Sequence, residues 1–284
     1  MGLFRLKRFL ASMGFDEILS YSLLSEKKIS DAGFLPSDCH RVVNTTSAEQ
    51  AFFRPNLLSG MLDAVLFNVY RKASSLKFFE IGNRYFKGRE ETVLSLAFYG
   101  AMEENWARKN PSMVYDLKGV VENVLDHLRV TGVEWAGSDA LWSGKKIVSL
   151  GEVPQAILER WDIPHDVFYA EITLDELFQN KKDTVRIQPI PKFPSVRRDI
   201  AFIVDNRFSV KELQDSMKEA AKPYLGQVAL FDQFAGKNIP EGKRSLAFSL
   251  WYQKEDGTFT DDQIQALQTK VGESLKKLYQ VEFR

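Results

Sequence analysis

Three prolines between residues 189 and 194 interrupt the chain at a point where no regular helix can continue. A proline lacks the N–H that a helix or a central strand uses, and it holds the residue before it in an extended conformation. The run from Ile200 to Val204, mostly β-branched or aromatic, follows closely and predicts a buried strand. The prolines therefore mark a linker, and the sequence predicts two domains, residues 1–185 and residues 186–284.

The second domain has a regular succession of predicted elements. Capping boxes at Ser209 and Thr260 each predict the start of a helix. Residues 246–252 alternate large apolar side chains with small ones, which is typical of a strand with one buried face. Strands are expected at residues 200–204, 228–234, 246–252 and 281–283. The resulting β-α-β-β-α-β order predicts a ferredoxin-like domain, with one sheet and two helices on one of its faces.

The first domain mixes helical and strand patterns, so the predicted fold class is α+β. Apolar residues at helical spacing predict helices at residues 58–69 and 116–128. The apolar runs 76–86 and 92–99 are joined by a charged turn and predict an antiparallel hairpin, while residues 167–172 predict a further strand.

Composition narrows the class of protein. Of 284 residues, 44% are hydrophobic and 27% charged, as in a soluble globular protein, and no apolar run nears the roughly 20 residues of a membrane span. The single cysteine, Cys39, and the lack of a secretory signal favour the cytoplasm. Three scattered histidines predict no metal site. With 38 basic and 38 acidic residues, bulk electrostatics do not predict nucleic-acid binding.

Three stretches of the first domain resemble the signature motifs of class II aminoacyl-tRNA synthetases. Gly14 to Tyr21 resembles the first motif, in which a helix runs into Gly-Phe-x-Glu. Phe79 to Gly88 resembles the second, a strand that reads Phe-Glu-Ile-Gly. Ala170 to Leu177 occupies the place of the third, a glycine-rich strand that leads into a helix. The resemblance implies a class II antiparallel sheet core.

The residues that carry chemistry in those motifs are replaced in this chain. Phe86 stands where the second motif has its phosphate-binding arginine, and Gly88 where it has an acidic residue. Leu177 stands at the arginine of the third motif. Adenylate formation depends on cations that neutralise developing phosphate charge, so these replacements predict a catalytically silent core with no catalytic residue. The three motif glycines are also replaced, by Ala170, Ile172 and Leu174.

A silent class II core followed by a ferredoxin-like domain resembles one family, the bacterial-type phenylalanine–tRNA ligase β subunits. Phe193 to Asp205, Phe231 to Phe234 and Gly242 to Phe248 resemble the anticodon-binding domain of that family. The resemblance implies two partners, a catalytic α subunit in a heterotetramer and the tRNA(Phe) anticodon. ATP and magnesium are expected only in the holoenzyme. Because the family's usual subunit is much longer, we expect this chain to be its C-terminal part.

The resemblance makes several residues of the second domain candidates for RNA contact. Arg197 and Arg198 could contact anticodon phosphates or stack on a base, or one of them could pair with Asp199 or Asp232 and hold the sheet edge. Trp251 could stack on a base or be buried against the first domain. For the phenylalanines, packing is the favoured alternative. The full set of candidates is Arg197, Arg198, Phe231, Phe234, Lys243, Arg244 and Trp251.

The first helix is where class II cores meet a partner, so the resemblance implies that Leu3, Leu6 and Leu10 face the α subunit. Two other functions stay open on the sequence. One is a stand-alone class II ligase, which the missing arginines disfavour. The other is an amino-acid-sensing regulatory protein, because such proteins share the β-α-β-β-α-β order.

Overall fold

The computed structural model describes residues 2–45, 47–100, 113–179, 190–236 and 239–283. The chain divides into two compact units, Met1–Thr184 and Val185–Arg284. The domain boundary expected between residues 185 and 186 lies outside the described residues. Each unit combines helices with a largely antiparallel sheet, which confirms the predicted α+β class.

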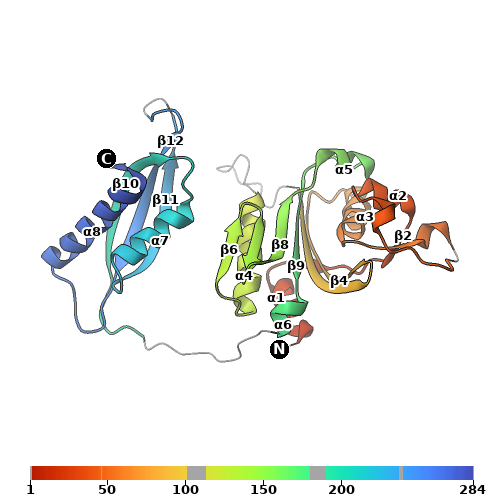
Figure 1. Cartoon of the computed structure of the whole chain (residues 1–284), viewed down its shortest axis with the longest axis horizontal. Coiled ribbons are helices and arrows are strands. Elements are labelled where there is room, and N and C mark those ends of the chain that lie inside the picture. The colour runs from red at the N-terminus through yellow and green to blue at the C-terminus, as the bar shows by residue number, and fades with distance from the viewer. Residues whose placement is uncertain (1, 46, 101–112, 180–189, 237–238, 284) are drawn as a thin grey trace. The chain divides into compact units, whose positions relative to one another are not determined.

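The first unit is built on a seven-stranded sheet of order β1-β4-β5-β9-β8-β7-β6 (Figure 1). The predicted hairpin is confirmed as β4 (Ser75–Phe86) and β5 (Arg89–Gly100), and β9 (Val167–Thr173) pairs antiparallel with β5. The remaining strands are β8 (Lys145–Glu152), β7 (Asp139–Trp142), β6 (Val133–Ala136) and, parallel to β4, β1 (Asp16–Glu17).

Helices cover both faces of this sheet because its central strands are apolar on both sides (Figure 1). Phe79 and Leu96 point into one core, while their neighbours Phe78 and Ala97 point into the other. The first core is closed by α1 (Leu3–Ser12), α4 (Met113–His127) and α6 (Asp175–Gln179), and the second by α3 (Leu58–Val69) and α5 (Gln155–Arg160). A smaller apolar cluster is formed by α2 (Glu26–Asp31), the paired strands β2 (Leu23–Leu24) and β3 (Phe52–Phe53), and the buried Cys39. Two 3-10 turns, Pro36–Asp38 and Ala48–Gln50, lie in the same part of the chain.

The structure corrects the predicted partner face of α1. Leu6 and Leu10 are buried in the first core of this chain, so they cannot face an α subunit, whereas Leu3 is exposed. An apolar helix stripe shows that a face is covered, but it does not show whether its own chain or a partner covers it.

The second unit has the predicted ferredoxin-like arrangement. Its elements are β10 (Val196–Asp205), α7 (Val210–Ala220), β11 (Leu225–Phe234), β12 (Lys243–Tyr252), α8 (Asp261–Tyr279) and β13 (Glu282–Phe283). The sheet order is β11-β12-β10-β13 with all neighbours antiparallel, and both predicted capping boxes are formed. Leu246, Phe248 and Tyr252 are buried in the core between the sheet and the helices.

Candidate functional site

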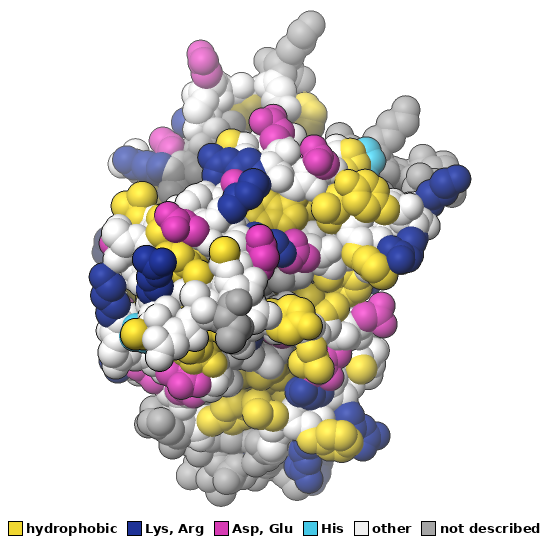
Figure 2. Space-filling view, turned by 90° about the vertical axis from the view of Figure 1, so that its right-hand side faces the viewer, with side chains coloured by type: hydrophobic (Ala, Val, Ile, Leu, Met, Phe, Trp, Pro, Cys, Tyr) yellow, Lys and Arg dark blue, Asp and Glu magenta, His cyan; other side chains and the backbone are white. Residues whose placement is uncertain are grey.

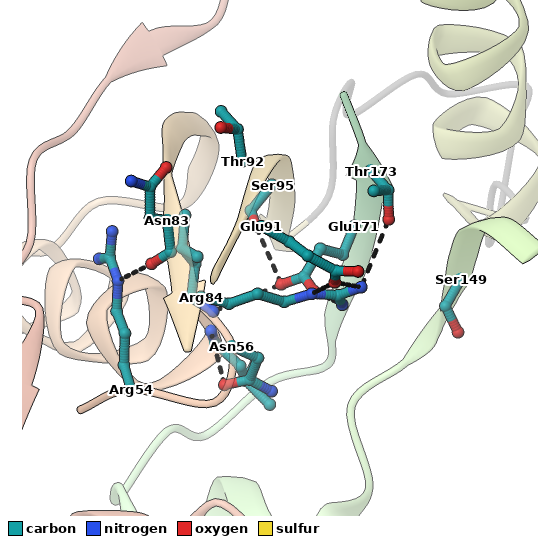
Figure 3. A network of polar contacts seen from close by, with 12 residues as sticks. Arg54, Asn56, Asn83, Arg84, Glu91, Thr92, Ser95, Ser149, Glu171 and Thr173 are labelled. Atoms are coloured by element: carbon teal, nitrogen blue, oxygen red, sulfur yellow. Dashed lines mark hydrogen bonds and ion pairs between the residues drawn. The ribbon is translucent and has the colours of Figure 1, made fainter. Parts of the chain in front are cut away.

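The sheet of the first unit carries a group of charged side chains on the face that α3 partly covers. Alternation places Glu80 and Arg84 of β4 on the same face as Glu171 of β9. Together with Arg54 and Glu91 they form the first-sheet network, which lies at the second and third signature motifs (Figure 3).

Arg54 and Glu80 form the deepest pair of the first-sheet network. Arg54 Nη1 lies 2.7 Å from Glu80 Oε1, and the Ser20 hydroxyl donates to Glu80 Oε2 at 2.7 Å. Both members of the pair are buried. Two glycines allow this approach: a Cβ on Gly82 would lie 2.3 Å from Arg54 Nη2, and one on Gly60 would lie 2.2 Å from Ser20 Oγ. The pair is therefore enclosed by the fold.

Arg84 is held between two carboxylates. Figure 3 shows its side chain reaching from β4 toward Glu171 and Thr173 of β9. It forms an ion pair with Glu171 and another, of 2.7 Å, with Glu91. Burial alone would lower the pKa of Arg84, but Glu171 and Glu91 more than offset this and raise it. Arg84 therefore stays charged and paired.

Tyr169 completes the polar face, a role that no motif in the sequence predicted. Its hydroxyl donates to Glu171 Oε2 at 2.7 Å and lies 3.0 Å from the Ser95 hydroxyl. Burial, and next the charge of Glu171, raise the pKa of Tyr169 well above its usual value. The hydroxyl therefore stays protonated and donates a hydrogen bond to the carboxylate.

The signature positions lie around this network. The Phe86 ring lies under the Arg84 and Arg89 guanidinium groups, at 5.3 and 5.4 Å from its centroid, and Gly88 forms the hairpin turn with a positive φ of 77°. Leu177 is buried in the first core, as are the side chains at the three glycine positions, Ala170, Ile172 and Leu174.

A nucleoside triphosphate does not fit this arrangement. The three carboxylates of the first-sheet network balance its two arginines together with Arg89, which pairs with Glu91 at 2.8 Å, so the arginines offer a phosphate no net positive charge. The side chains at the motif's glycine positions belong to the core, so no bare backbone is offered there. Among the described residues, no cluster of three or more histidine, cysteine, aspartate or glutamate side chains is arranged to hold a metal ion.

The second unit has a sheet face that neither of its helices covers, here called the open face (Figure 1). Alternation sorts the predicted RNA-contact residues between the two faces. Arg197 pairs in register with Trp251, and Lys243 with Asp205, on the open face. Arg198 and Arg244 are register partners of Leu250 and Val204, which belong to the core, so they lie on the helix side.

The two helix-side arginines are engaged by the fold. Arg198 Nη2 lies 2.9 Å from Asp261 Oδ1, at the start of α8, so its partner is neither Asp199 nor Asp232. Arg244 Nη2 donates to the Phe208 carbonyl at 2.7 Å. Their place on the helix side of the sheet separates Arg198 and Arg244 from the candidates on the open face.

On the open face, Arg197 lies over the Trp251 indole, with its guanidinium carbon 5.5 Å from the ring centroid. Arg197 Nε also donates to Asp199 Oδ1 at 3.1 Å, and the Ser249 hydroxyl donates to the same oxygen at 2.7 Å. Asp199 and Ser249 were not among the predicted site residues, although the alternation along their strands could have placed them on this face.

The remaining candidates lie toward the edges of the sheet. Lys243 pairs with Glu282 of β13 at 2.6 Å. Phe231 and Phe234 of the edge strand β11 are 56% and 47% exposed and are not part of the second unit's core, so the packing favoured for them is not packing in that core. An irregularity between Leu230 and Asp232 leaves Phe231 without a register partner. RNA contact by these residues stays a prediction.

Comparison with family models divides the chain in the same way. A model described as "Phenylalanyl tRNA synthetase beta chain CLM domain" matches residues 3–174. A second, described as "Ferredoxin-fold anticodon binding domain", matches residues 191–284.

Curated relatives agree with these models along the whole chain. The phenylalanine–tRNA ligase β subunit of Bacillus licheniformis is 31% identical over 99% of this chain and 37% of that protein. That of Symbiobacterium thermophilum is 31% identical over 96% of this chain and 33% of that protein. The chain thus spans about a third of the length of these relatives.

A solved structure supports the fold. The crystal structure of a pyrrolysyl-tRNA synthetase from Desulfitobacterium hafniense matches 65% of this chain and 74% of that one, with a TM-score of 0.51 and 17% identity. At that identity the match shows the class II fold alone. Within the described residues, no helix combines the length and apolar character needed to cross a membrane.

Proposed function

The chain belongs to the phenylalanine–tRNA ligase β-subunit family, and from this premise we propose that it supports the catalytic α subunit and binds the tRNA(Phe) anticodon. The observation that carries the proposal is the order of the two matched models, a β-chain core followed by an anticodon-binding fold. The parent reaction joins phenylalanine to its tRNA at the expense of ATP. We place the chain in the cytoplasm, where that reaction serves translation.

We further propose that the chain alone does not activate phenylalanine, and that ATP and magnesium act elsewhere in the holoenzyme. Its support is the paired first-sheet network and the core side chains at the glycine positions. The test is phenylalanine-dependent ATP–pyrophosphate exchange by the purified chain. No exchange above background is expected, and a rate that follows the chain's concentration would contradict the proposal.

The contact with the α subunit is proposed at exposed apolar side chains of the first unit. Leu3 and Phe4 of α1 are both exposed. Leu19 and Tyr21 are also exposed, and they line a cavity of about 450 Å³. Figure 2 looks onto the side of the unit that carries α2 and β2, and shows hydrophobic side chains between charges of both signs. An apolar surface with a polar rim is typical of a protein interface.

The partner surface is tested by mixing the chain with a catalytic α subunit and measuring the mass of the complex, for which a heterotetramer is expected. Leu19→Ser with Tyr21→Ser should weaken assembly. Phe231→Ser, which removes an exposed aromatic side chain from the second unit, is the control and should not weaken assembly. Failure of the wild-type chain to associate would contradict the proposal.

The anticodon proposal is tested by titrating the chain with an anticodon stem-loop of tRNA(Phe) over a salt series. Binding should weaken as salt rises, because each phosphate contact releases counterions. If the stem-loop does not bind and a free amino acid binds the second unit, the result would instead favour an amino-acid-sensing regulatory protein.

A further inference from the structure

The open face of the second unit carries a preassembled platform made of Arg197 and Trp251. The two residues are direct register partners on β10 and β12, and the guanidinium lies over the indole at 5.5 Å. The Arg197 side chain is 55% exposed and the Trp251 side chain is half-buried, so the platform is both anchored and accessible. A guanidinium and an indole each present a flat face on which a nucleobase can stack.

We propose that this platform stacks one unpaired base of the bound RNA and that Asp199 is the positioning residue that holds Arg197 in place over Trp251. The inference rests on the proposed function and assigns one contact within it.

The position of Arg197 is set by contacts outside the platform itself. Its Nε and Nη2 donate to the two Asp199 carboxylate oxygens, at 3.1 and 3.4 Å. Asp199 is in turn fixed by the Ser249 hydroxyl at 2.7 Å. The hydrogen bond from Ser249, followed by that from Arg197, lowers the pKa of Asp199, so the carboxylate is charged near neutral pH. A fork-shaped contact of this kind fixes the plane of the guanidinium as well as its position.

The surroundings leave room for a base beside the platform. Next to Trp251 on β12, the open-face positions are Ser249 and Ala247, whose partners across the sheet include Ala201 and Ala229, while Trp251 itself lies between Arg197 and Gln227. Small side chains on the neighbouring strands form a low floor, so a planar ligand can approach the indole edge and the guanidinium without displacing a large group.

Charge distinguishes a stacking platform from a phosphate site. Arg197 and Asp199 cancel, so the platform carries no net charge and neutralises no phosphate. Its loss should therefore lower RNA affinity by the same factor at every salt concentration, because the salt dependence reports the number of phosphates neutralised. Breaking the ion pair should instead free Arg197 for a phosphate, and the salt dependence should become steeper.

The test measures the affinity of the full chain for a fluorescent tRNA(Phe) anticodon stem-loop at several salt concentrations. Trp251→Ala should weaken binding about 10- to 100-fold with an unchanged salt slope, and Trp251→Phe should recover part of the loss. Asp199→Asn should increase the salt slope by about one phosphate contact and weaken binding at high salt, where that contact contributes least and the stacking geometry is lost. A merely structural role would not change the slope. Arg198→Ala is the matched control, because Arg198 is adjacent to Arg197 in the sequence but lies on the helix side, and this variant should bind like the wild type.

The experiment distinguishes failure of the platform from failure of the proposed function. If the wild-type chain binds the stem-loop and Trp251→Ala binds equally well, the platform is refuted while the proposed function stands. If the wild-type chain does not bind the stem-loop at any salt concentration, the proposed function fails and the platform fails with it.

Discussion

Two arginine–carboxylate pairs, one in each unit, have the same chemistry in opposite surroundings. In the first unit Arg54 and Glu80 approach to 2.7 Å, with side chains 4% and 2% exposed. In the second, Arg197 and Asp199 approach to 3.1 Å, with side chains 55% and 49% exposed. The enclosed pair cannot reach a ligand, and the loss of either partner would leave a buried charge. The solvated pair contributes little to folding but presents its guanidinium to solvent. Burial therefore distinguishes Arg54, which stabilises the fold, from Arg197, whose guanidinium a ligand can reach from solvent.

The largest expected effect comes from breaking the enclosed pair. Arg54→Met leaves Glu80 charged and unpaired, and should lower the free energy of unfolding of the first unit by about 3–5 kcal/mol. The matched change Arg197→Met should leave stability almost unchanged, because water replaces the lost partner. Hydrogen exchange of the full chain, analysed separately for each unit, measures both.

The double variant Arg54→Met with Glu80→Met sharpens this result. It removes both charges, so it should recover part of the stability lost in Arg54→Met. Equal losses in the single and double variants would show that packing of the arginine, and not the unpaired carboxylate, accounts for the effect.

A smaller effect is expected from the glycine that admits Arg54. Gly82→Ala places a Cβ 2.3 Å from Arg54 Nη2 and should cost about 1–3 kcal/mol, since the arginine must move within a filled site. Gly151→Ala, on β8 of the same sheet, meets no atom within 4 Å and is the control. Urea denaturation compares the two variants, and equal stabilities would contradict a tightly enclosed pair.

The smallest effect concerns a buried hydroxyl in the core of the second unit. Tyr252 Oη has no hydrogen-bond partner among the described residues, so Tyr252→Phe should stabilise that unit by about 1 kcal/mol at neutral pH. Thermal denaturation tests this, and a clear loss of stability would point to a partner of the hydroxyl.

The same hydroxyl predicts a pH dependence. Burial raises the pKa of Tyr252 to about 12, from an ordinary value of 10. The folded state then holds its proton more tightly than the unfolded state does, so stability falls as pH rises from 10 toward 12. Tyr252→Phe should lack this part of the fall, and identical pH profiles would contradict the raised pKa.

The sequence predicted the second unit more fully than the first. Capping boxes at Ser209 and Thr260 and the alternation along β12 are local signals, and each formed as expected. By contrast, β6 and β7 are only four residues long and contain no apolar run of more than three residues, so they depend on the neighbouring strands. A local sequence pattern therefore predicts a helix or strand only where the residues of that helix or strand are enough to specify it.

The candidate site shows the same limit. Alternation could have separated Arg198 from Arg197, because side-chain direction along a strand is a local property. No local pattern could show that Leu6 and Leu10 are covered by their own chain, or that Glu171 lies beside Arg84, since residues distant in sequence make these contacts. The replacement of the signature residues could be recognised in the sequence at Phe86 and Leu177, whereas the network of side chains around them became visible only in the fold.

The central claim is that RNA binds the open face of the second unit and not the sheet that carries the first-sheet network. Its most direct test is hydrogen exchange of the full chain, with and without a saturating tRNA(Phe) anticodon stem-loop. With the stem-loop bound, we expect slower exchange in β10, β11 and β12 and unchanged exchange in β4, β5 and β9. Slower exchange confined to β4, β5 or β9, or no change in the second unit, would contradict it.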